Sequence, residues 1–173
     1  MIITPSDGFI RPADTTAYDV GDLVANSTTA GNVVPLTFDI ADFPLRSGVI
    51  GYVRVFKDDA TVTNANFNLH LFTKRPIVTN GDNGALATST AENYLGLIAC
   101  DLTSGAFATT TDVLKRFQIL SQASLASIFA FDLTKIPAAH EIYGLLAAAA
   151  AYTPASGETF RVWLEIGDDG GNR

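Results

Sequence analysis

NFNLHLFTK, residues 66–74, is the stretch of sequence that decides the fold class. Its apolar and polar residues alternate, with Phe67, Leu69 and Leu71 on one side and Asn66, Asn68 and His70 on the other. An apolar residue at every second position is typical of a β-strand that buries one face. We therefore predict a half-buried strand here, the clearest in the chain.

The same alternation recurs along most of the sequence. Further strands are predicted over residues 33–40, 49–58, 94–100, 116–120, 128–133 and 158–167. Both faces of 49–58 are largely apolar, which favours a central strand covered on both sides, and 58–65 is predicted as a hairpin connection. Seven or more strands separated by turn-rich loops predict a mainly β fold, an antiparallel β-sandwich with jelly-roll-like topology.

Two segments depart from this alternation. Residues 1–33 are rich in Thr, Asn, Gly and Asp and predict an extended N-terminal arm, with one short strand near 20–25. The β-sandwich domain is then expected over 34–173. Within it, PAAHEIYGLLAAAAAYTP (137–154) has apolar residues at helical spacing between two prolines, which predicts a short Ala-rich helix over 139–151. This helix is expected to be a lid on the sandwich or an oligomer contact.

Composition limits the classes of function. The chain of 173 residues carries a formal net charge of −7 and only 17% charged residues. The acidic balance argues against a nucleic-acid partner, which would require a basic stripe. Few charges and many small side chains favour burial against partner proteins. The N-terminus lacks the pattern of a signal peptide and no apolar run has the length of a membrane span, so we expect synthesis in a cytoplasm and no membrane partner.

The sequence contains no recognisable catalytic signature. Cys100 lies alone in an apolar run, which favours a small buried residue over a nucleophile. His70 and His140 lack the further ligands that a metal site needs. Nothing in the sequence marks Asp58-Asp59 or Asp168-Asp169 as a convergent carboxylate pair. We therefore predict no catalytic residue, cofactor or metal, and a protein that is not an enzyme.

TNGDNGALATST (79–90) resembles a calcium loop at first sight, but the spacing of its oxygen ligands does not fit one. Counting from Asn80 or from Asp82 places glycine or alanine where an EF-hand requires a carboxylate or an amide. Asn-Gly and Asp-Asn-Gly are instead typical of tight turns that adopt positive φ. We predict a surface turn made by Asn80, Asp82 and Asn83, which could contact a neighbouring molecule.

Three phrases carry a resemblance to a known family. FIRPADTTAYDVGDLVANST (9–28), NFNLHLFTKRPIVTNGDNGALATSTAENYLG (66–96) and EIYGLLAAAAAYTPASGETFRVWLEI (141–166) resemble small virion structural proteins of tailed bacteriophages, in the same order. The resemblance implies a non-enzymatic virion component, a capsid decoration or cement protein made in the bacterial host cytoplasm. Its partners would be the major capsid protein and other virion proteins, with homo-oligomers, trimers favoured.

Several residues are candidate contacts with the capsid or between subunits. They are Arg11, Tyr18, Leu23, Val24, Tyr143 and Trp163. In this hypothesis the arm lies along a neighbour, so removing residues 1–30 should leave the sandwich folded. Two alternatives stay open. One is a neck, tail or head-fibre component, and the other is a carbohydrate-binding module in which Trp163 stacks on a sugar ring.

Overall fold

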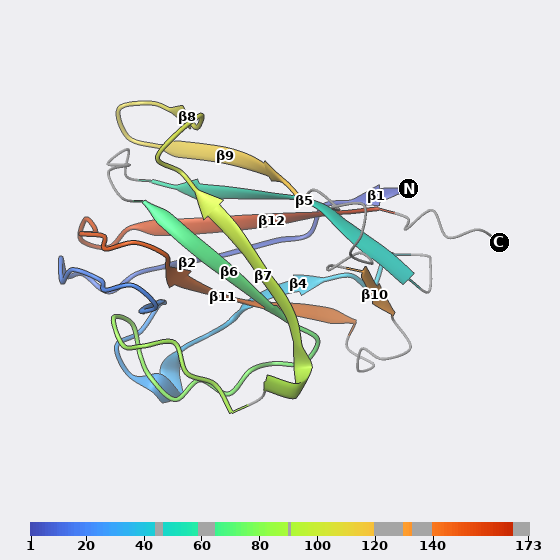
Figure 1. The fold of residues 1–173 in the computed structure, drawn as a ribbon, viewed down its shortest axis with the longest axis horizontal. Helices are drawn as coiled ribbons and strands as arrows, with labels where there is room; N and C mark the ends of the chain where they lie inside the picture. Colours follow the sequence, from blue (N-terminus) through green and yellow to red (C-terminus); the bar gives the residue numbers. More distant parts are fainter. Residues whose placement is uncertain (44–46, 59–64, 90, 120–129, 133–139, 168–173) are drawn as a thin grey trace.

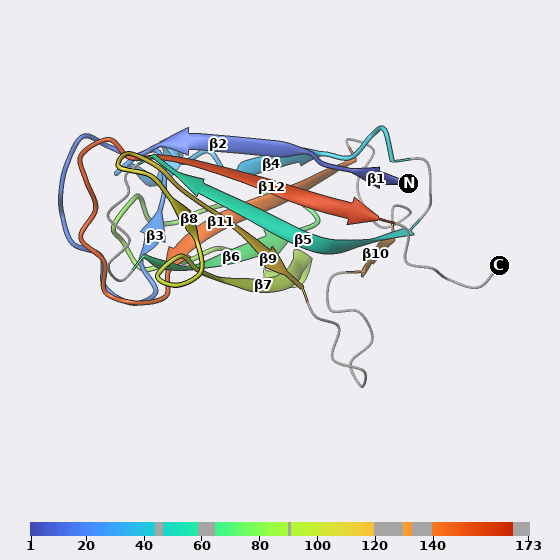
Figure 2. The ribbon, with the colours of Figure 1, turned by 90° about the horizontal axis from the view of Figure 1, so that it is seen from above.

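A computed structural model of the chain describes residues 1–43, 47–58, 65–89, 91–119, 130–132 and 140–167. Two antiparallel sheets pack face to face in these residues (Figures 1 and 2). The predicted antiparallel β-sandwich is therefore confirmed. Each of the seven predicted strands overlaps a strand of the structure, because alternating apolar residues bury one face of a strand wherever it lies in a sandwich.

The first sheet has seven strands and is centred on β5 and β12. Its members are β1 (Ile2–Ile3), β2 (Ser6–Ile10), β5 (Ser47–Lys57), β8 (Phe107–Ala108), β9 (Val113–Gln118), β10 (Ala130–Asp132) and β12 (Thr159–Gly167). The order is β1-β12-β5-β9-β8, with β2 also paired to β12 and β10 to β5.

The second sheet has five strands and is centred on β11. Its members are β3 (Leu23–Val24), β4 (Leu36–Asp39), β6 (Asn66–Phe72), β7 (Tyr94–Asp101) and β11 (Glu141–Ala148). The order is β3-β11-β6-β7, and β4 pairs with β11 beside β3. Two short 3₁₀ turns, η1 (Ala30–Asn32) and η2 (Ala91–Asn93), lie in the loops.

The main core fills the space between the two sheets. It is made of inward side chains from both, including Phe38, Val53, Phe67, Val162 and Leu164, each with no exposed surface. A smaller cluster covers the opposite face of the second sheet. It consists of Leu23, Ala25, Val33, Phe72 and Leu145, packed by Val78, Leu86 and Tyr143. The second sheet is therefore buried on both faces over part of its area.

The predicted helix over 139–151 is wrong, because this segment contains strand β11. β11 pairs with β6 along one side and with β3 and β4 along the other. Alanine favours a helix by itself, but a helix of this length containing a glycine is marginal without tertiary packing. Hydrogen bonding to strands on both sides of β11, together with burial of both its faces, outweighs that preference. Small residues are required here, since a Cβ on Gly144 would lie 3.1 Å from the Phe38 ring.

The predicted separate arm over 1–33 also differs from the structure. β1 and β2 pair with β12, and β3 pairs with β11, so this segment contributes strands to both sheets. Its backbone is extended, as expected, and the short strand near 20–25 is present as Leu23–Val24. A boundary at residue 33 therefore divides no structural unit, because the sequence signal for an arm came from weak alternation in strands of two to five residues.

The prediction of a hairpin between the strands at 49–58 and 66–74 is wrong as well. β5 belongs to the first sheet and β6 to the second, so the chain crosses between sheets there. β5 is central, with β12 and β9 on its two sides, as its composition indicated. Its outward side chains, however, are only half-buried.

Candidate functional site

A fully buried ion pair ties the N-terminal segment to the TNGDNG turn. Arg11 Nη2 lies 3.1 Å from Asp82 Oδ2, and neither side chain is exposed. Asp82 Oδ1 accepts hydrogen bonds from the Tyr18 hydroxyl and from the Ala25 backbone N–H, both at 2.7 Å. Arg11 Nε also donates to the Tyr18 hydroxyl. The carboxylate is thus surrounded by donors, which a buried charge needs to be tolerated.

The same contacts shift two pKa values. Burial, together with the hydrogen bond to Asp82, raises the pKa of Tyr18 well above its ordinary value. Burial acts to lower the pKa of Arg11, but Tyr18 and Asp82 outweigh it and the net shift is upward. Arg11 therefore stays charged and Tyr18 neutral across the physiological range.

A second buried ion pair lies next to the first. Lys57 Nζ lies 3.0 Å from Glu158 Oε1, and both side chains are fully buried. The same oxygen accepts from the Tyr152 hydroxyl and from the Ala155 backbone N–H. Lys57 Nζ also lies 5.5 Å from the centroid of the Tyr152 ring. This pair joins β5 to the turn that leads into β12.

The two ion pairs form one continuous structure, which we call the buried lock: Arg11, Tyr18, Lys57, Asp82, Tyr152 and Glu158. The rings of Tyr18 and Tyr152 stack at 6.1 Å, and their backbones exchange hydrogen bonds of 2.8 and 3.2 Å. Arg11 Nη1 donates to the Ala155 carbonyl at 3.1 Å. The lock therefore joins four segments that are far apart in the sequence: residues 11–18, β5, the turn at 81–84 and residues 152–158.

The TNGDNG segment is a turn, but its aspartate is not on the surface. The Gly84 N–H donates to the Gly81 carbonyl at 3.1 Å, and Asn83 has a φ of 63°. Asp82 is only 6% exposed, which corrects its prediction as a surface residue. Asn83 Nδ2 donates to the carbonyls of Thr16 and Ala17, and Asn80 Nδ2 donates to the Ala85 carbonyl. The turn contacts the N-terminal segment of its own chain.

Four of the predicted contact residues are buried in the chain itself. Arg11, Tyr18, Leu23 and Val24 are each at most 3% exposed. Their burial corrects the prediction that they contact a capsid or another subunit. Tyr143 is half-buried, packs against the smaller cluster and donates a hydrogen bond from its hydroxyl to Glu141. Only Trp163 of this set lies on an open face of the sandwich.

Trp163 belongs to a row of arginine and aromatic side chains on the outer face of the first sheet. Cross-strand pairing places Trp163 opposite Arg54 on β5, and Arg54 opposite Arg116 on β9. The guanidinium carbon of Arg54 lies 5.2 Å from the Trp163 ring centroid, and that of Arg161 lies 5.9 Å away. Alternation puts all of them on the side away from the core.

Glu165 forms ion pairs with two arginines of this row, Arg54 and Arg116. Arg116 Nε donates to Glu165 Oε1 at 2.8 Å, Arg116 Nη2 donates to Oε2, and Arg54 Nε lies 3.3 Å from Oε1. These hydrogen bonds from Arg116 lower the pKa of Glu165. Arg116 also stacks on Tyr52, with its guanidinium carbon 3.4 Å from the ring centroid. We call this row the arginine–aromatic face: Tyr52, Arg54, Phe56, Arg116, Arg161 and Trp163.

Sequence reasoning missed both the lock and most of this face. The face had a signal, since YVRVF (52–56) and RVWLE (161–165) alternate buried residues with arginine and aromatic ones. The register that brings the two stretches side by side is not encoded in either of them. The lock had no local signal, because its partners come from segments as far apart in the sequence as those of Tyr18 and Tyr152.

Two of the reactive side chains that the sequence drew attention to, Cys100 and His70, have shifted pKa values; Asp59, Asp168 and Asp169 lie outside the described residues. Cys100 is fully buried, and burial raises the pKa of its thiol to about 12. His70 Nδ1 lies 3.1 Å from the Tyr94 hydroxyl, and burial lowers the pKa of this histidine. Within the described residues, no three His, Cys, Asp or Glu side chains gather as a metal site would need. No helix in the described ranges has the length and apolar character to cross a membrane.

One hollow places two carboxylate residues together. It has a volume of about 330 Å³ and is lined by Asp58, Thr110, Thr111, Ala155, Ser156, Gly157 and Glu158. Asp58 Oδ1 accepts from the Thr159 N–H at 2.7 Å, and Glu158 Oε1 is held in the lock. Glu158 Oε2 is buried and has no hydrogen-bond partner among the described residues. Both carboxylate side chains are thus bound by groups of their own chain.

Comparison with known proteins identifies no family for the chain. No family model matches the sequence, and no curated protein matches it. Among solved structures, the chain is similar to the capsid protein in a crystal structure of decameric BFDV capsid protein. That similarity has 9% sequence identity and a TM-score of 0.36, and it covers 96% of this chain and 97% of the other. A likeness at this level supports no conclusion about function.

Proposed function

We propose that this chain is a non-enzymatic structural protein of a bacteriophage virion, and that it decorates the capsid by binding the major capsid protein lattice. The proposal starts from the sequence resemblance to small phage virion proteins. The arrangement of the resembling segments in the fold supports it.

One observation carries the proposal: the sequence segments that resemble phage virion proteins lie close together in the fold. RPADTTAY (11–18) contributes Arg11 and Tyr18, NGDNG (80–84) contributes Asp82, and AYTPASGE (151–158) contributes Tyr152 and Glu158. The most distinctive sequence segments of the resemblance therefore contribute residues that contact one another in the buried lock. Residues that pack against one another in a core restrict which amino acids each position can hold. Two proteins that share several such segments are therefore expected to share a fold.

The lock also suits a protein whose task is mechanical. The N-terminal segment is held to both sheets by β-pairing and to the turn by buried charges. Such cross-links between distant segments resist local opening, because no segment can leave without exposing a buried ion. A rigid body of this kind transmits load between neighbours, and many copies on a lattice bind strongly by avidity.

Electron cryomicroscopy of the phage that encodes the chain tests this proposal. We expect density for the sandwich at repeated positions on the capsid lattice, and loss of that density when the gene is deleted. Particles without the protein should also release DNA at lower temperature. Density at one vertex or along the tail would instead support a neck, tail or head-fibre component. Absence of the protein from purified particles would overturn the virion role.

Glycan binding through Trp163 is the remaining alternative class. In the structure the Trp163 ring has Arg54 and Arg161 beside it and is half-buried, so less of its face is free to stack on a sugar. Binding on a glycan array that disappears in Trp163→Ala would favour this alternative.

A further inference from the structure

The arginine–aromatic face is a basic region in an acidic protein. It contains Arg54, Arg116 and Arg161 with Glu165 as its acid, a local charge of +2. The whole chain has 11 basic and 18 acidic residues, so eight basic and 17 acidic residues lie elsewhere. The arginines are also accessible, since the side chains of Arg54 and Arg116 are 35% and 49% exposed.

The composition of this face is that of a binding surface. Trp, Tyr and Arg are the residue types enriched where alanine substitution weakens protein–protein binding most. Their positions are already fixed in the free chain by the ion pairs to Glu165 and by the contacts of Arg116 with Tyr52 and Arg54 with Trp163. Side chains held in place before binding lose less conformational entropy when a partner arrives.

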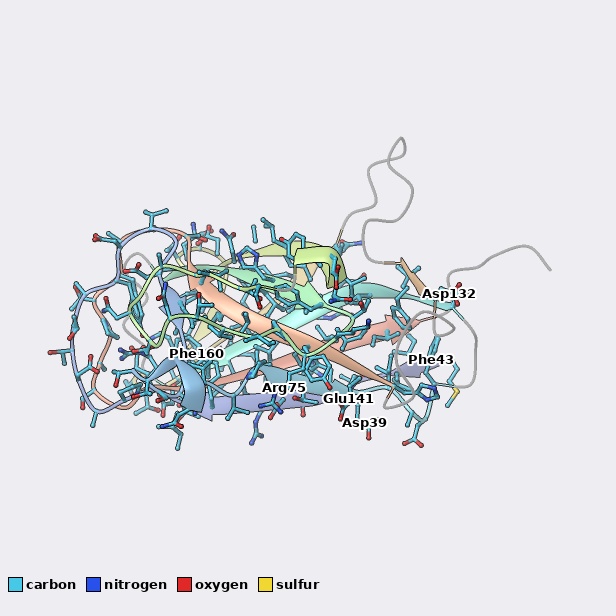
Figure 3. The ribbon with its side chains drawn as sticks, turned by 90° about the horizontal axis from the view of Figure 1, so that it is seen from below. Asp39, Phe43, Arg75, Asp132, Glu141 and Phe160 are labelled. Atoms are coloured by element: carbon cyan, nitrogen blue, oxygen red, sulfur yellow. The ribbon has the colours of Figure 1, made fainter. Side chains whose placement is uncertain are left out.

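A complementary acidic patch lies on the other sheet. Asp39 on β4 is directly opposite Glu141 on β11, and the exposed Asp42 follows three residues later. We call these three residues the acidic patch. Figure 3 shows Asp39 and Glu141 along the same margin of the molecule as Arg75. With Arg75 included, the local charge is −2.

The acidic patch contains an unfavourable pairing that a cation would relieve. Like charges directly opposite each other on neighbouring strands destabilise a sheet. Asp39 Oδ1 accepts a backbone hydrogen bond from Ala41 at 2.9 Å, and Glu141 accepts one from the Tyr143 hydroxyl. A guanidinium from outside would offset the repulsion and find exposed carboxylate oxygens to bind.

The two surfaces cannot meet within one copy. The arginine–aromatic face is the outer side of the first sheet, whereas Asp39 and Glu141 alternate with the buried Phe38 and Ile142 and so point outward from the second sheet. Two arginine–aromatic faces placed against each other would repel. A contact between copies that uses the arginine–aromatic face must therefore join it to an unlike surface, and the opposite placement of the two surfaces makes that contact heterologous.

We propose that the arginine–aromatic face of one copy docks on the acidic patch of a second copy, in a head-to-tail contact. This inference goes beyond the virion role, since it names the subunit interface and its polarity. Heterologous contacts repeat from copy to copy and form a closed ring or an open filament, depending on the rotation between neighbours. The contact is electrostatic and therefore weakens with salt.

Sedimentation velocity of the full chain tests the contact directly. We expect the wild-type protein to form species larger than a dimer as concentration rises. Raising the salt from about 0.1 M to about 1 M shortens the screening length from about 10 Å to about 3 Å, and should shift the protein toward monomer.

Two neutralised variants make the test specific. The face variant carries Arg116→Gln and Arg161→Gln, and the patch variant carries Asp39→Asn and Asp42→Asn. Each should weaken self-association by about thirtyfold or more, as expected for central interface residues. Mixed together, the two variants should form a 1:1 complex and nothing larger. The intact face of the patch variant can bind the intact patch of the face variant. This complex cannot add further copies, because its two remaining surfaces are the neutralised ones.

Matched controls are available at exposed charges outside both surfaces. Lys74→Gln and Glu92→Gln remove one charge of each sign and should associate like the wild type. Thermal unfolding of every variant checks that it is folded, since all substituted side chains are at the surface. A wild-type protein that stays monomeric, variants that associate normally, or a mixture that stays monomeric would each overturn the head-to-tail contact.

Failure of the head-to-tail contact and failure of the proposed virion role would give different results. If the wild type is monomeric but the face variant is lost from particles, the face binds a different virion protein and self-docking is wrong. If self-association behaves as expected while the protein is absent from particles, the interface holds and the virion role fails.

Discussion

Arg11 and Asp82 are 71 positions apart in the sequence and form an ion pair of 3.1 Å with no exposed side-chain surface. The pair joins the N-terminal segment to a turn that follows strand β6. Breaking a buried pair is expensive because one charge is left without a partner in the interior. This contact therefore makes the N-terminal segment part of the folded unit.

Replacing Asp82 by alanine should destabilise the protein by about 3–5 kcal/mol, the usual effect of removing one partner of a buried pair. The substitution removes the 3.1 Å partner of Arg11 Nη2, which keeps a 3.5 Å contact with Asp14, and it leaves the Ala25 N–H without its acceptor. Urea unfolding followed by circular dichroism measures the change. Asp19→Ala, at an exposed position, is the control and should be near neutral. An Asp82→Ala protein as stable as wild type would show that the pair contributes nothing.

Replacing Gly81 by alanine should lower the melting temperature by roughly 4–8 °C, because overpacking costs about 2 kcal/mol and a chain of this size loses about 2–4 °C for each kcal/mol. An added Cβ would lie 2.0 Å from the Thr28 carbonyl oxygen, so the turn must move away from the N-terminal segment. Gly31→Ala is the matched control, since its Cβ would meet nothing within 4 Å. Equal melting temperatures for the two variants would contradict the close approach.

Deleting residues 1–30 should prevent the protein from folding to a stable monomer. The deletion removes β1, β2 and β3 and the buried Tyr18, Leu23 and Val24, and it exposes the edge of β12. We expect aggregation or loss of the cooperative thermal transition by calorimetry. The sequence alone had predicted that the sandwich would survive this deletion. A truncated protein that melts like the full chain would restore the interpretation as a free arm.

Cys100 should react slowly in the native protein. Burial raises the pKa of its thiol from 9.0 to about 12, so at pH 8 its thiolate is on the order of a thousandfold rarer. Alkylation in buffer should be slower by at least that factor than alkylation in urea, measured by mass spectrometry. Rapid alkylation of the folded protein would contradict the burial.

The same thiol predicts a pH dependence of stability. Because the pKa is higher in the folded state than in the unfolded state, the contribution of the neutral thiol is complete below about pH 9. It is lost as the pH rises toward 12, since only the unfolded chain releases the proton in that window. Cys100→Ala should flatten the stability curve between these pH values, compared with the wild type. An unchanged slope would show that other groups, such as Tyr18, account for it.

Seven of the β-strands could be predicted because their signal is local. Seven segments with apolar residues at every second position overlap strands of the structure, including 66–74 as β6. The period of two is a property of the strand itself, and half-burial in a sandwich preserves it. The turn at 81–84 was predictable for the same reason, since Asn and Gly next to each other tolerate positive φ.

The candidate site was mostly hidden from the sequence. Asp82 was predicted at the surface because polar residues in a glycine-rich turn are usually solvated, but Arg11 and Tyr18 cover it. Trp163 was predicted as a contact residue, and the structure places it among arginines from three strands. A charged residue is compatible with burial only when its partner is supplied, and the partners here come from distant segments.

By itself, the sequence determined that the chain forms a β-sandwich, because alternation and turn chemistry are written in neighbouring residues. Only the tertiary structure decided which strands pair, that the alanine-rich segment 141–148 becomes the central strand of the second sheet, and that the N-terminal segment joins both sheets. Alanine prefers a helix when the chain is isolated. Here two hydrogen-bonded neighbours and two covered faces outweigh that preference, and both belong to segments far away in the sequence.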